Sequence, residues 1–218
     1  MKSPVLTFFS SGNIDLLAIG ITSAAVLLLG VLVYFNNRKN ITAKALLFFA
    51  LATIVYSVTN YLNYQDLSET LVLWFLRLTL FTAVWHALSF FHLAYVFPET
   101  KRSLSRTYFF VTIPLAIAAS LVTLSPFAIS GISDLAPAGE ASTGTHGPGM
   151  LIFAAAVVFF VAGGIFLLIR KAIRAHDVNE RRQFILFNTG VFSTFLLITV
   201  FNVVLPVGFE NTSFIILA

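Results

Sequence analysis

Residues 71–106 read LVLWFLRLTLFTAVWHALSFFHLAYVFPETKRSLSR, and this stretch decides how the chain is built. Its residues 71–97 are mostly apolar. A hydrocarbon core of about 30 Å needs roughly 20 apolar residues at a rise of 1.5 Å each. Pro98 closes the run, and Lys101, Arg102 and Arg106 follow within a few residues. An apolar run long enough to cross a membrane therefore ends at a short basic gap.

The same pattern recurs on both sides of this stretch. Eleven of the thirteen Lys and Arg residues lie in three gaps between apolar runs: Arg38, Lys39 and Lys44; Lys101, Arg102 and Arg106; Arg170, Lys171, Arg174, Arg181 and Arg182. The alternate gaps carry acids and no base, namely Asp66 and Glu69, then Asp134 and Glu140, then Glu210. Positive residues beside spanning helices are held on the cytoplasmic side. The alternation predicts an all-α, polytopic membrane helix bundle with its N-terminus outside.

The lengths of the apolar runs predict the individual spans. They lie at about 14–35, 45–63, 71–97, 107–125, 150–170 and 184–205. A further apolar run opens at Phe214, and the sequence stops at Ala218. We therefore expect one transmembrane domain over residues 1–218, with six complete spans and the start of a seventh that continues toward the cytoplasm.

Composition agrees with a membrane location and excludes several functions. The chain is 58% hydrophobic and only 10% charged, whereas about 25% of a soluble domain is charged. Basic loops beside anionic lipid account for most of the net charge of +4, so we expect no nucleic-acid partner. The absence of cysteine excludes disulfides and thiol nucleophiles. Hydrolase, zinc-peptidase and phosphate-loop motifs are also absent, so we predict no enzyme activity, metal or cofactor.

Arg77 is the first candidate for a functional residue. It lies about 9 Å inside the outer edge of the third span, where a charge is costly. One reading has Arg77 snorkel outward, with Trp74 as an interface anchor. In the other reading it faces the bundle, where it pairs with an outside acid such as Glu210 or Asp15, or binds an anionic ligand.

Other polar residues inside the spans complete the candidate site. His86 lies near mid-membrane, where a lone histidine is more typical of hydrogen-bonded packing than of a proton relay. His92 is about 120° away around the helix, so the two do not share a metal easily. Asn60 and Asn202 lie near the depth of Arg77, which places an outer pocket between the second, third and sixth spans. The predicted ligand-binding residues are Arg77, Trp74, Asn60, Asn202 and His86.

The one long gap between apolar runs, residues 126–149, lies outside on this topology. It contains five glycines and three prolines. This composition is typical of a flexible linker, and a lid over a pocket is the alternative.

The order of these features resembles the N-terminal seven-helix sensor region of bacterial histidine kinases. The resemblance rests on residues 74–78 (WFLRL) and 91–99 (FHLAYVFPE) of the third span. It rests also on residues 181–183 (RRQ) leading into a span with Gly190, and on residues 202–206 (NVVLP) closing that span. It covers residues 14–218, nearly the whole chain.

The resemblance implies a membrane input domain, followed after the seventh helix by cytoplasmic sensor and histidine kinase modules or by a nucleotide cyclase. This stretch of chain contains no phosphoacceptor histidine, ATP site or dimerisation coiled coil. We interpret it as a multi-pass sensory domain of the bacterial inner membrane. Its expected partners are the lipid bilayer, a small-molecule or lipid ligand, a cytoplasmic module of the same full-length chain, and a second copy in a homodimer.

Two other functions fit the sequence. One is a small transporter or permease component with an anion site at Arg77, and the other is a structural membrane subunit without a ligand. Transporters often show inverted repeats and broken helices around a midplane site. No repeat relates the two halves of this sequence, which favours the sensor.

Overall fold

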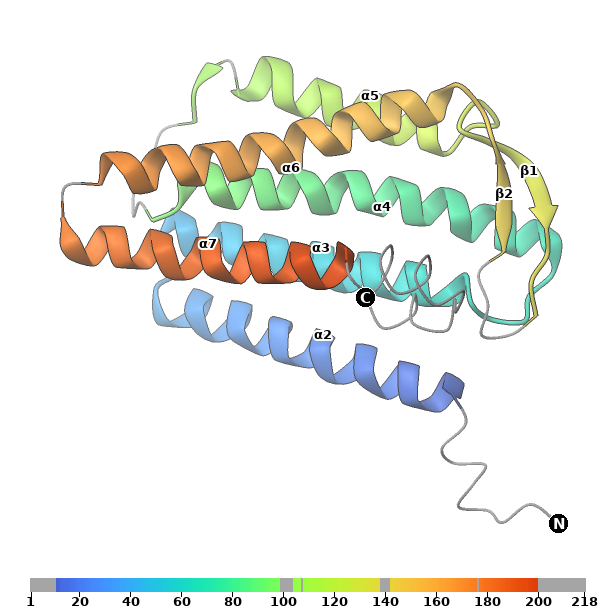
Figure 1. Cartoon of the computed structure of the whole chain (residues 1–218), viewed down its shortest axis with the longest axis horizontal. Helices are drawn as coiled ribbons and strands as arrows, with labels where there is room; N and C mark the ends of the chain where they lie inside the picture. The colour runs from blue at the N-terminus through green and yellow to red at the C-terminus, as the bar shows by residue number, and fades with distance from the viewer. Residues whose placement is uncertain (1–10, 99–103, 107, 138–141, 176, 200–218) are drawn as a thin grey trace, which may run out of the picture. The chain divides into compact units, whose positions relative to one another are not determined.

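The computed structural model describes residues 11–98, 104–106, 108–137, 142–175 and 177–199. In chain order, its elements are α2 (Ser11–Asn36), α3 (Ile41–Leu62), α4 (Glu69–Val96), the π-helical turn η1 (Tyr108–Thr112), α5 (Ile113–Thr123), β1 (Ile129–Asp134), β2 (Thr143–His146), α6 (Gly149–Arg174) and α7 (Val178–Thr199) (Figure 1). A helix therefore lies at each of the first six predicted spans. The end of the predicted sixth span and the start of the seventh lie outside the described residues.

Several of these helices are suited to a membrane by length and composition. Four are long and apolar enough to cross one: Ile19–Asn36 of α2, then α3, α4 and α6. The apolar helix over Tyr108–Thr123 is shorter. Large apolar side chains are exposed on these helices, among them Phe110 at 77% and Leu151 at 76%. Such surfaces are expected to face lipid, so we conclude that this is a helical membrane protein.

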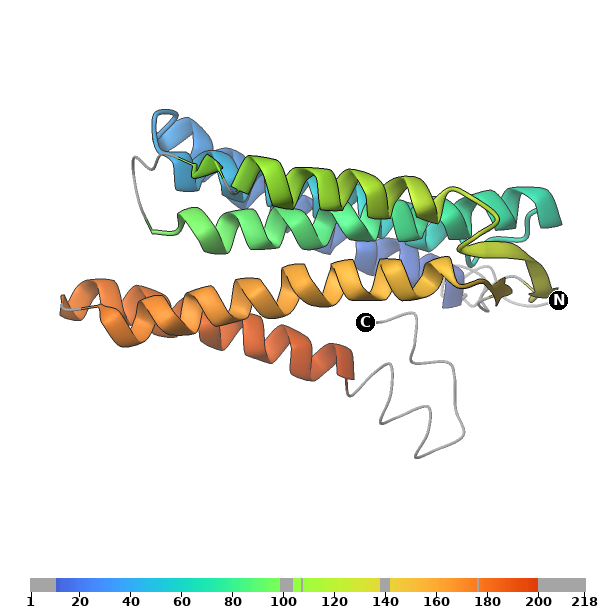
Figure 2. The ribbon, with the colours of Figure 1, turned by 90° about the horizontal axis from the view of Figure 1, so that it is seen from above.

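Residues 19–164 form one compact unit, in which α4 packs against α3 and α5. Figure 1 shows α3 beside α4, and Figure 2, seen from above, shows α5 beside α4. Small residues allow the helices to approach closely. On α2, a Cβ added at Gly30 would lie 2.9 Å from the Cβ of Ala50 on α3. On α6, a Cβ added at Gly164 would lie 2.7 Å from the Phe90 ring.

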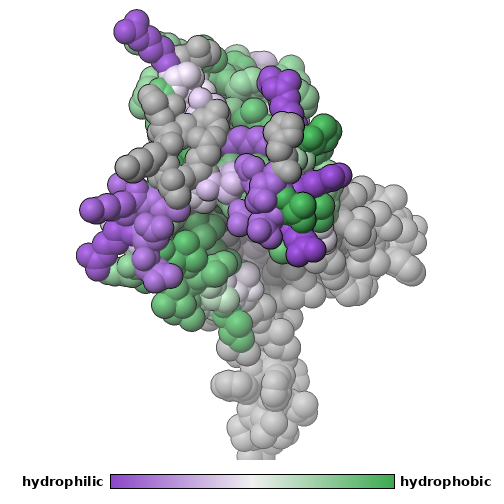
Figure 3. Space-filling model, turned by 90° about the vertical axis from the view of Figure 1, so that its left-hand side faces the viewer, coloured by the Kyte–Doolittle hydropathy of each residue, from purple (hydrophilic) through white to green (hydrophobic). Residues whose placement is uncertain are grey.

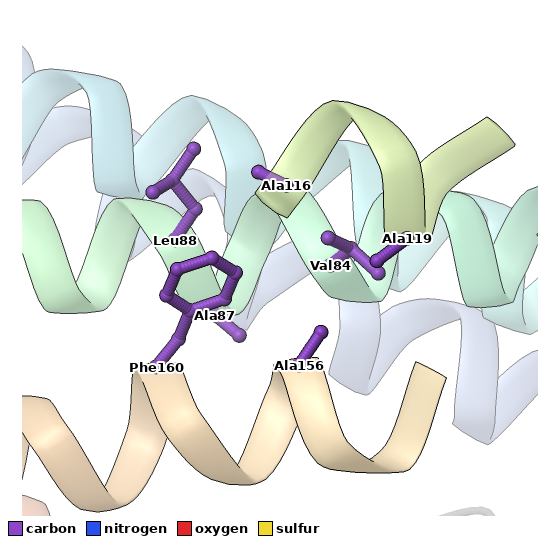
Figure 4. Packing of buried hydrophobic residues seen from close by; sticks show 7 residues of the cluster. All are labelled: Val84, Ala87, Leu88, Ala116, Ala119, Ala156 and Phe160. Atoms are coloured by element: carbon purple, nitrogen blue, oxygen red, sulfur yellow. The ribbon is translucent and has the colours of Figure 1, made fainter. Parts of the chain in front are cut away.

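The core of this unit lies where α4, α5 and α6 meet. Figure 4 shows its members: Val84, Ala87 and Leu88 on α4, Ala116 and Ala119 on α5, and Ala156 and Phe160 on α6. Alanines on three helices bring the backbones together, and the fully buried Phe160 ring fills the space between them.

Local sequence explains where the helices begin and end. The side chain of Asn40 accepts a hydrogen bond from the Thr42 N–H at 2.8 Å and caps the start of α3. α4 ends at Val96 because Pro98 disfavours a helical conformation for Phe97, whose ψ is 140°. Pro114 lies in the first turn of α5, where a missing N–H is tolerated.

The long gap is not simply a linker, because residues 129–146 include an antiparallel β-hairpin. β1 pairs with β2 in a register that sets Ile129 opposite His146 and Asp134 opposite Thr143. The base of the hairpin is closed by two hydrogen bonds, from Gly147 N–H to Ala128 O at 2.8 Å and from Gly149 N–H to Phe127 O at 2.9 Å. This hairpin is the exception to the all-α prediction.

The C-terminal part of α6, from Ile165, belongs with α7 to a second unit. The two helices are joined by a short turn, in which the carboxylate of Asp177 accepts a hydrogen bond from the Glu180 N–H at 3.0 Å. This bond caps the first turn of α7.

Candidate functional site

Arg77 lies on α4 and is buried, with 7% of its surface exposed. Its Nε and Nη2 groups both donate to the backbone carbonyl oxygen of Ile129, at 3.1 and 2.7 Å. We call these two bonds the Arg77–Ile129 tether. Because Ile129 is the first residue of β1, the tether joins a charged group of a predicted span to the hairpin.

Packing holds the hairpin in the same place. Gly144 on β2 is buried, and a Cβ added to it would lie 2.8 Å from Ile129 Cγ2 and 3.6 Å from Leu76 Cδ1. Leu76 precedes Arg77 on α4. The hairpin thus contacts α4 through an apolar side chain and a charged one that are adjacent in sequence.

Among the predicted site residues that the structure describes, Trp74 lies beside Arg77. The Arg77 Cζ lies 5.5 Å from the centroid of the Trp74 ring, within the range of a cation–π interaction. Trp74 is 48% exposed. Asn60 is half-buried on α3, and within the described part of the chain its side chain makes no hydrogen bond. Asn202 lies outside the described residues.

His86 lies in a separate contact between α3 and α4. Its ring is stacked between Phe49 and Tyr56, with centroid distances of 5.2 and 5.3 Å. Its Nε2 is 3.1 Å from the Thr53 hydroxyl, which donates its own hydrogen to Phe49 O at 2.8 Å. The Thr53 hydroxyl is thus within hydrogen-bond distance of both a carbonyl of its own helix and the His86 ring. This is the hydrogen-bonded packing role that the sequence favoured for His86.

The contact with His86 is part of a longer row of polar pairs, which we call the α3–α4 seam: Thr53 with His86, Thr59 with Thr82, and Asn63 with Thr79. The last two pairs are 2.9 and 2.8 Å apart. Asn63 is only 5% exposed, and its Oδ1 is buried without a hydrogen-bond partner among the described residues. Hydrogen bonds between helices add about 0.6 kcal/mol each in a membrane.

A second polar contact lies at the other end of α4. His92 Nδ1 is 2.7 Å from the hydroxyl of Tyr108, the first residue of η1. Tyr108 is buried, and its ring stacks on Phe91 and approaches Tyr95. Single π-helical turns occur frequently at functional sites.

Sequence reasoning missed most of these partners. Thr53 carries a weak signal, because Phe49, Thr53 and Tyr56 recur at the three- and four-residue spacing of one helix face. The Ile129 carbonyl carries none, since every residue has one. In the described residues no group of three His, Asp or Glu side chains could hold a metal ion.

The helices, the buried charge and the polar seam define a class of protein: a helical membrane domain without a recognisable catalytic centre in its described residues. The model of one protein family, described as the N-terminal 7TM region of histidine kinase, matches residues 18–218. The chain belongs to this family, and the resemblance drawn from residues 74–78, 91–99, 181–183 and 202–206 is confirmed. This membership indicates a membrane sensory input domain. No curated protein and no solved structure matches the chain.

Proposed function

We propose that this chain is the sensory input domain of a bacterial inner-membrane receptor that passes a stimulus to a cytoplasmic kinase module of the same protein. The Arg77–Ile129 tether is the observation that carries this proposal beyond family membership. Through its two buried hydrogen bonds, the tether joins α4 to the hairpin. The hairpin lies at the end of α4 that we place outside the cell.

In this proposal α4 transmits the stimulus between its two ends. Arg77 and His92 are about 22 Å apart along the helix axis at 1.5 Å per residue. A ligand that moves the hairpin displaces Arg77, and a shift of α4 then changes how His92 meets Tyr108. The ligand biases this movement only through its different affinities for the two arrangements.

The proposed ligand-binding residues are Arg77, Trp74, Asn60, Asn202 and His86. Trp74 and Arg77 form the best-supported part, since their side chains are in contact and Trp74 is half exposed. His86 lies nine residues further along α4, so in this proposal it responds to a change in helix packing. The transporter alternative stays a prediction, and no contact of Arg77 favours it.

The proposed topology has seven spans with the N-terminus outside, and a second copy of the receptor completes a homodimer. The three basic gaps support this orientation. A homodimer fits a kinase module that phosphorylates its partner, and the stimulus would then change the packing of paired helices.

The test replaces Arg77 in the full-length gene product, expressed in its own membrane. Arg77→Gln should abolish the response to the stimulus while leaving the amount of receptor in the membrane unchanged, because glutamine is shorter and lacks the charge. Arg77→Lys should retain part of the response, since an ammonium donates to the carbonyl without the planar fork. Autophosphorylation with and without stimulus is the measurement.

Arg38→Gln serves as the matched control, because Arg38 is an exposed arginine in a predicted loop. It should leave the response unchanged. A full response from Arg77→Gln would contradict the role of the tether. A gene product that carries no kinase module would overturn the proposed function itself.

A further inference from the structure

The turn between α6 and α7 concentrates positive charge. Residues 170–182 contain two acids, Asp177 and Glu180, and five bases: Arg170, Lys171, Arg174, Arg181 and Arg182. All four arginines are exposed, and within the described residues no carboxylate pairs with any of them. Figure 3 shows the left-hand side of Figure 1, on which hydrophilic side chains are exposed. The turn therefore offers uncompensated guanidinium groups.

Helix stability explains only some of these bases. Lys171 and Arg174 lie in the last turn of α6, where positive charge is favourable beside the helix C-terminus. Arg181 and Arg182 follow the first turn of α7, where the helix dipole does not favour a cation. Asp177 already caps that end. Helix stability therefore does not account for these two arginines, whereas a negative partner outside the described chain would.

The exposed apolar residues of the turn indicate where that partner lies. α6 has 26 residues, which is about 39 Å of helix against a hydrocarbon core of about 30 Å. Its last turns therefore extend into the headgroup region. Ile173 is 79% exposed and Val178 is 64% exposed, one on each side of the turn. Apolar side chains beside arginines are typical of segments that lie at the boundary between headgroups and acyl chains.

We propose that the α6–α7 turn binds the phosphate groups of anionic lipid headgroups. Ile173 and Val178 contact the upper acyl chains, while the guanidinium groups of Arg170, Arg174, Arg181 and Arg182 bind phosphate oxygens in pairs. Groups of four to eight Lys and Arg beside a spanning helix bind anionic lipid in this way. This site needs only the membrane location and does not rest on the proposed sensory function.

The test measures which lipid lies next to the turn. The chain has no cysteine, so Ala175→Cys carries a single fluorophore at the turn. The protein is placed in phosphatidylcholine nanodiscs that contain a small fraction of spin-labelled phosphatidylglycerol or, separately, spin-labelled phosphatidylcholine. The anionic label should quench the fluorophore about twofold more than the neutral label. Because both leaflets of a nanodisc are identical, the result does not depend on topology.

Three variants show whether the excess quenching comes from this turn. Arg181→Gln with Arg182→Gln should abolish it, and Arg181→Lys with Arg182→Lys should retain most of it. Arg38→Gln with Lys39→Gln removes the same charge from another loop and should leave it unchanged. Circular dichroism confirms that each variant keeps its helix content. Equal quenching by the two lipids would overturn the proposal. So would excess quenching that remains in the Arg181→Gln, Arg182→Gln variant, or that is lost in the Arg38→Gln, Lys39→Gln variant.

Free phosphate is distinguished from lipid in the same assay. Inorganic phosphate is added at an ionic strength matched with chloride. If the lipid headgroup is the occupant, phosphate and chloride should reduce the excess equally, through screening alone. Selective loss of the excess in phosphate would show that the turn binds the free anion, and the lipid proposal would then be wrong.

Discussion

Thr53 decides how His86 is accommodated between α3 and α4. Its hydroxyl lies 2.8 Å from the Phe49 carbonyl oxygen and 3.1 Å from His86 Nε2. The rings of Phe49 and Tyr56 both stack with the imidazole. An apolar replacement for Thr53 would therefore leave the Nε2 atom facing a methyl group in place of its hydroxyl partner.

Thr53→Val should destabilise the helix pair, and Thr53→Ser should not. Valine has the shape of threonine but no hydroxyl group, so the loss is about 1 kcal/mol, within the range of hydrogen bonds between membrane helices. We expect the midpoint of thermal unfolding in detergent to fall by about 2–4 °C for Thr53→Val. A midpoint unchanged within error in Thr53→Val would show that the bond contributes nothing net.

At the scale of residues, the sequence predicted which groups are costly to bury in a membrane, but not the groups to which they bind. The cost of a buried charge singles out Arg77, whereas its partner is a main-chain atom 52 residues away in the sequence. The asparagines of α3 show a second limit. The sequence offered Asn60 as a site residue, and this stays a prediction, whereas the structure shows Asn63 buried and bonded to Thr79. Composition does not reveal which side of an apolar helix faces its neighbour.

At the scale of elements, the hairpin depends on glycines at its base. A Cβ added to Gly147 would lie 2.3 Å from the Phe127 carbonyl oxygen, while one added to Gly131 in β1 would meet nothing within 4 Å. Both glycines belong to the same segment. They therefore provide a substitution that displaces the base of the hairpin and a control that does not.

Gly147→Ala should loosen the hairpin, and Gly131→Ala should leave it in place. The clash with main-chain atoms costs about 1–3 kcal/mol, because the backbone itself must move. Hydrogen exchange should then become faster at the amides of β1 and β2 in Gly147→Ala. Protection equal to that of the unchanged protein would show that the base of the hairpin does not hold it.

The helices were predicted from the sequence and the hairpin was not, for a physical reason. An apolar run of about 20 residues forms a helix in lipid because no water is present to satisfy its backbone. The strands are short, rich in Ser, Gly and Thr, and lack a clear alternation of apolar residues. The hydrogen bond that joins β1 to α4 comes from Arg77, which lies far from the strands in the sequence.

At the scale of the whole molecule, the orientation follows from the basic gaps and is open to a direct test. The single-cysteine variants Asn37→Cys and Ala175→Cys should resist a membrane-impermeant thiol reagent in intact cells, while a cysteine in place of the exposed Ser130 should be labelled. All three variants should react after the cells are opened, which controls for access. Labelling of the Asn37→Cys or Ala175→Cys variant in intact cells would contradict an N-terminus outside.

The charge pattern predicts orientation because it reports where each loop meets lipid and water. It does not predict how helices pack, since lipid and neighbouring helices are equally apolar. The packing of α4 against α5 and α6 uses alanines and glycines at three- and four-residue spacing, which marks one face of a helix but does not name the helix that it contacts. Family membership adds the class of domain.

The tether has a consequence for the evolution of the hairpin. Arg77 binds the carbonyl oxygen of Ile129, and any residue at position 129 would supply the same acceptor. Relatives can therefore exchange the outward side chains of the hairpin without losing the bond to α4. Pairwise covariation across such relatives should show no signal between positions 77 and 129. Divergence of the hairpin surface and preservation of its bond to α4 are thus compatible.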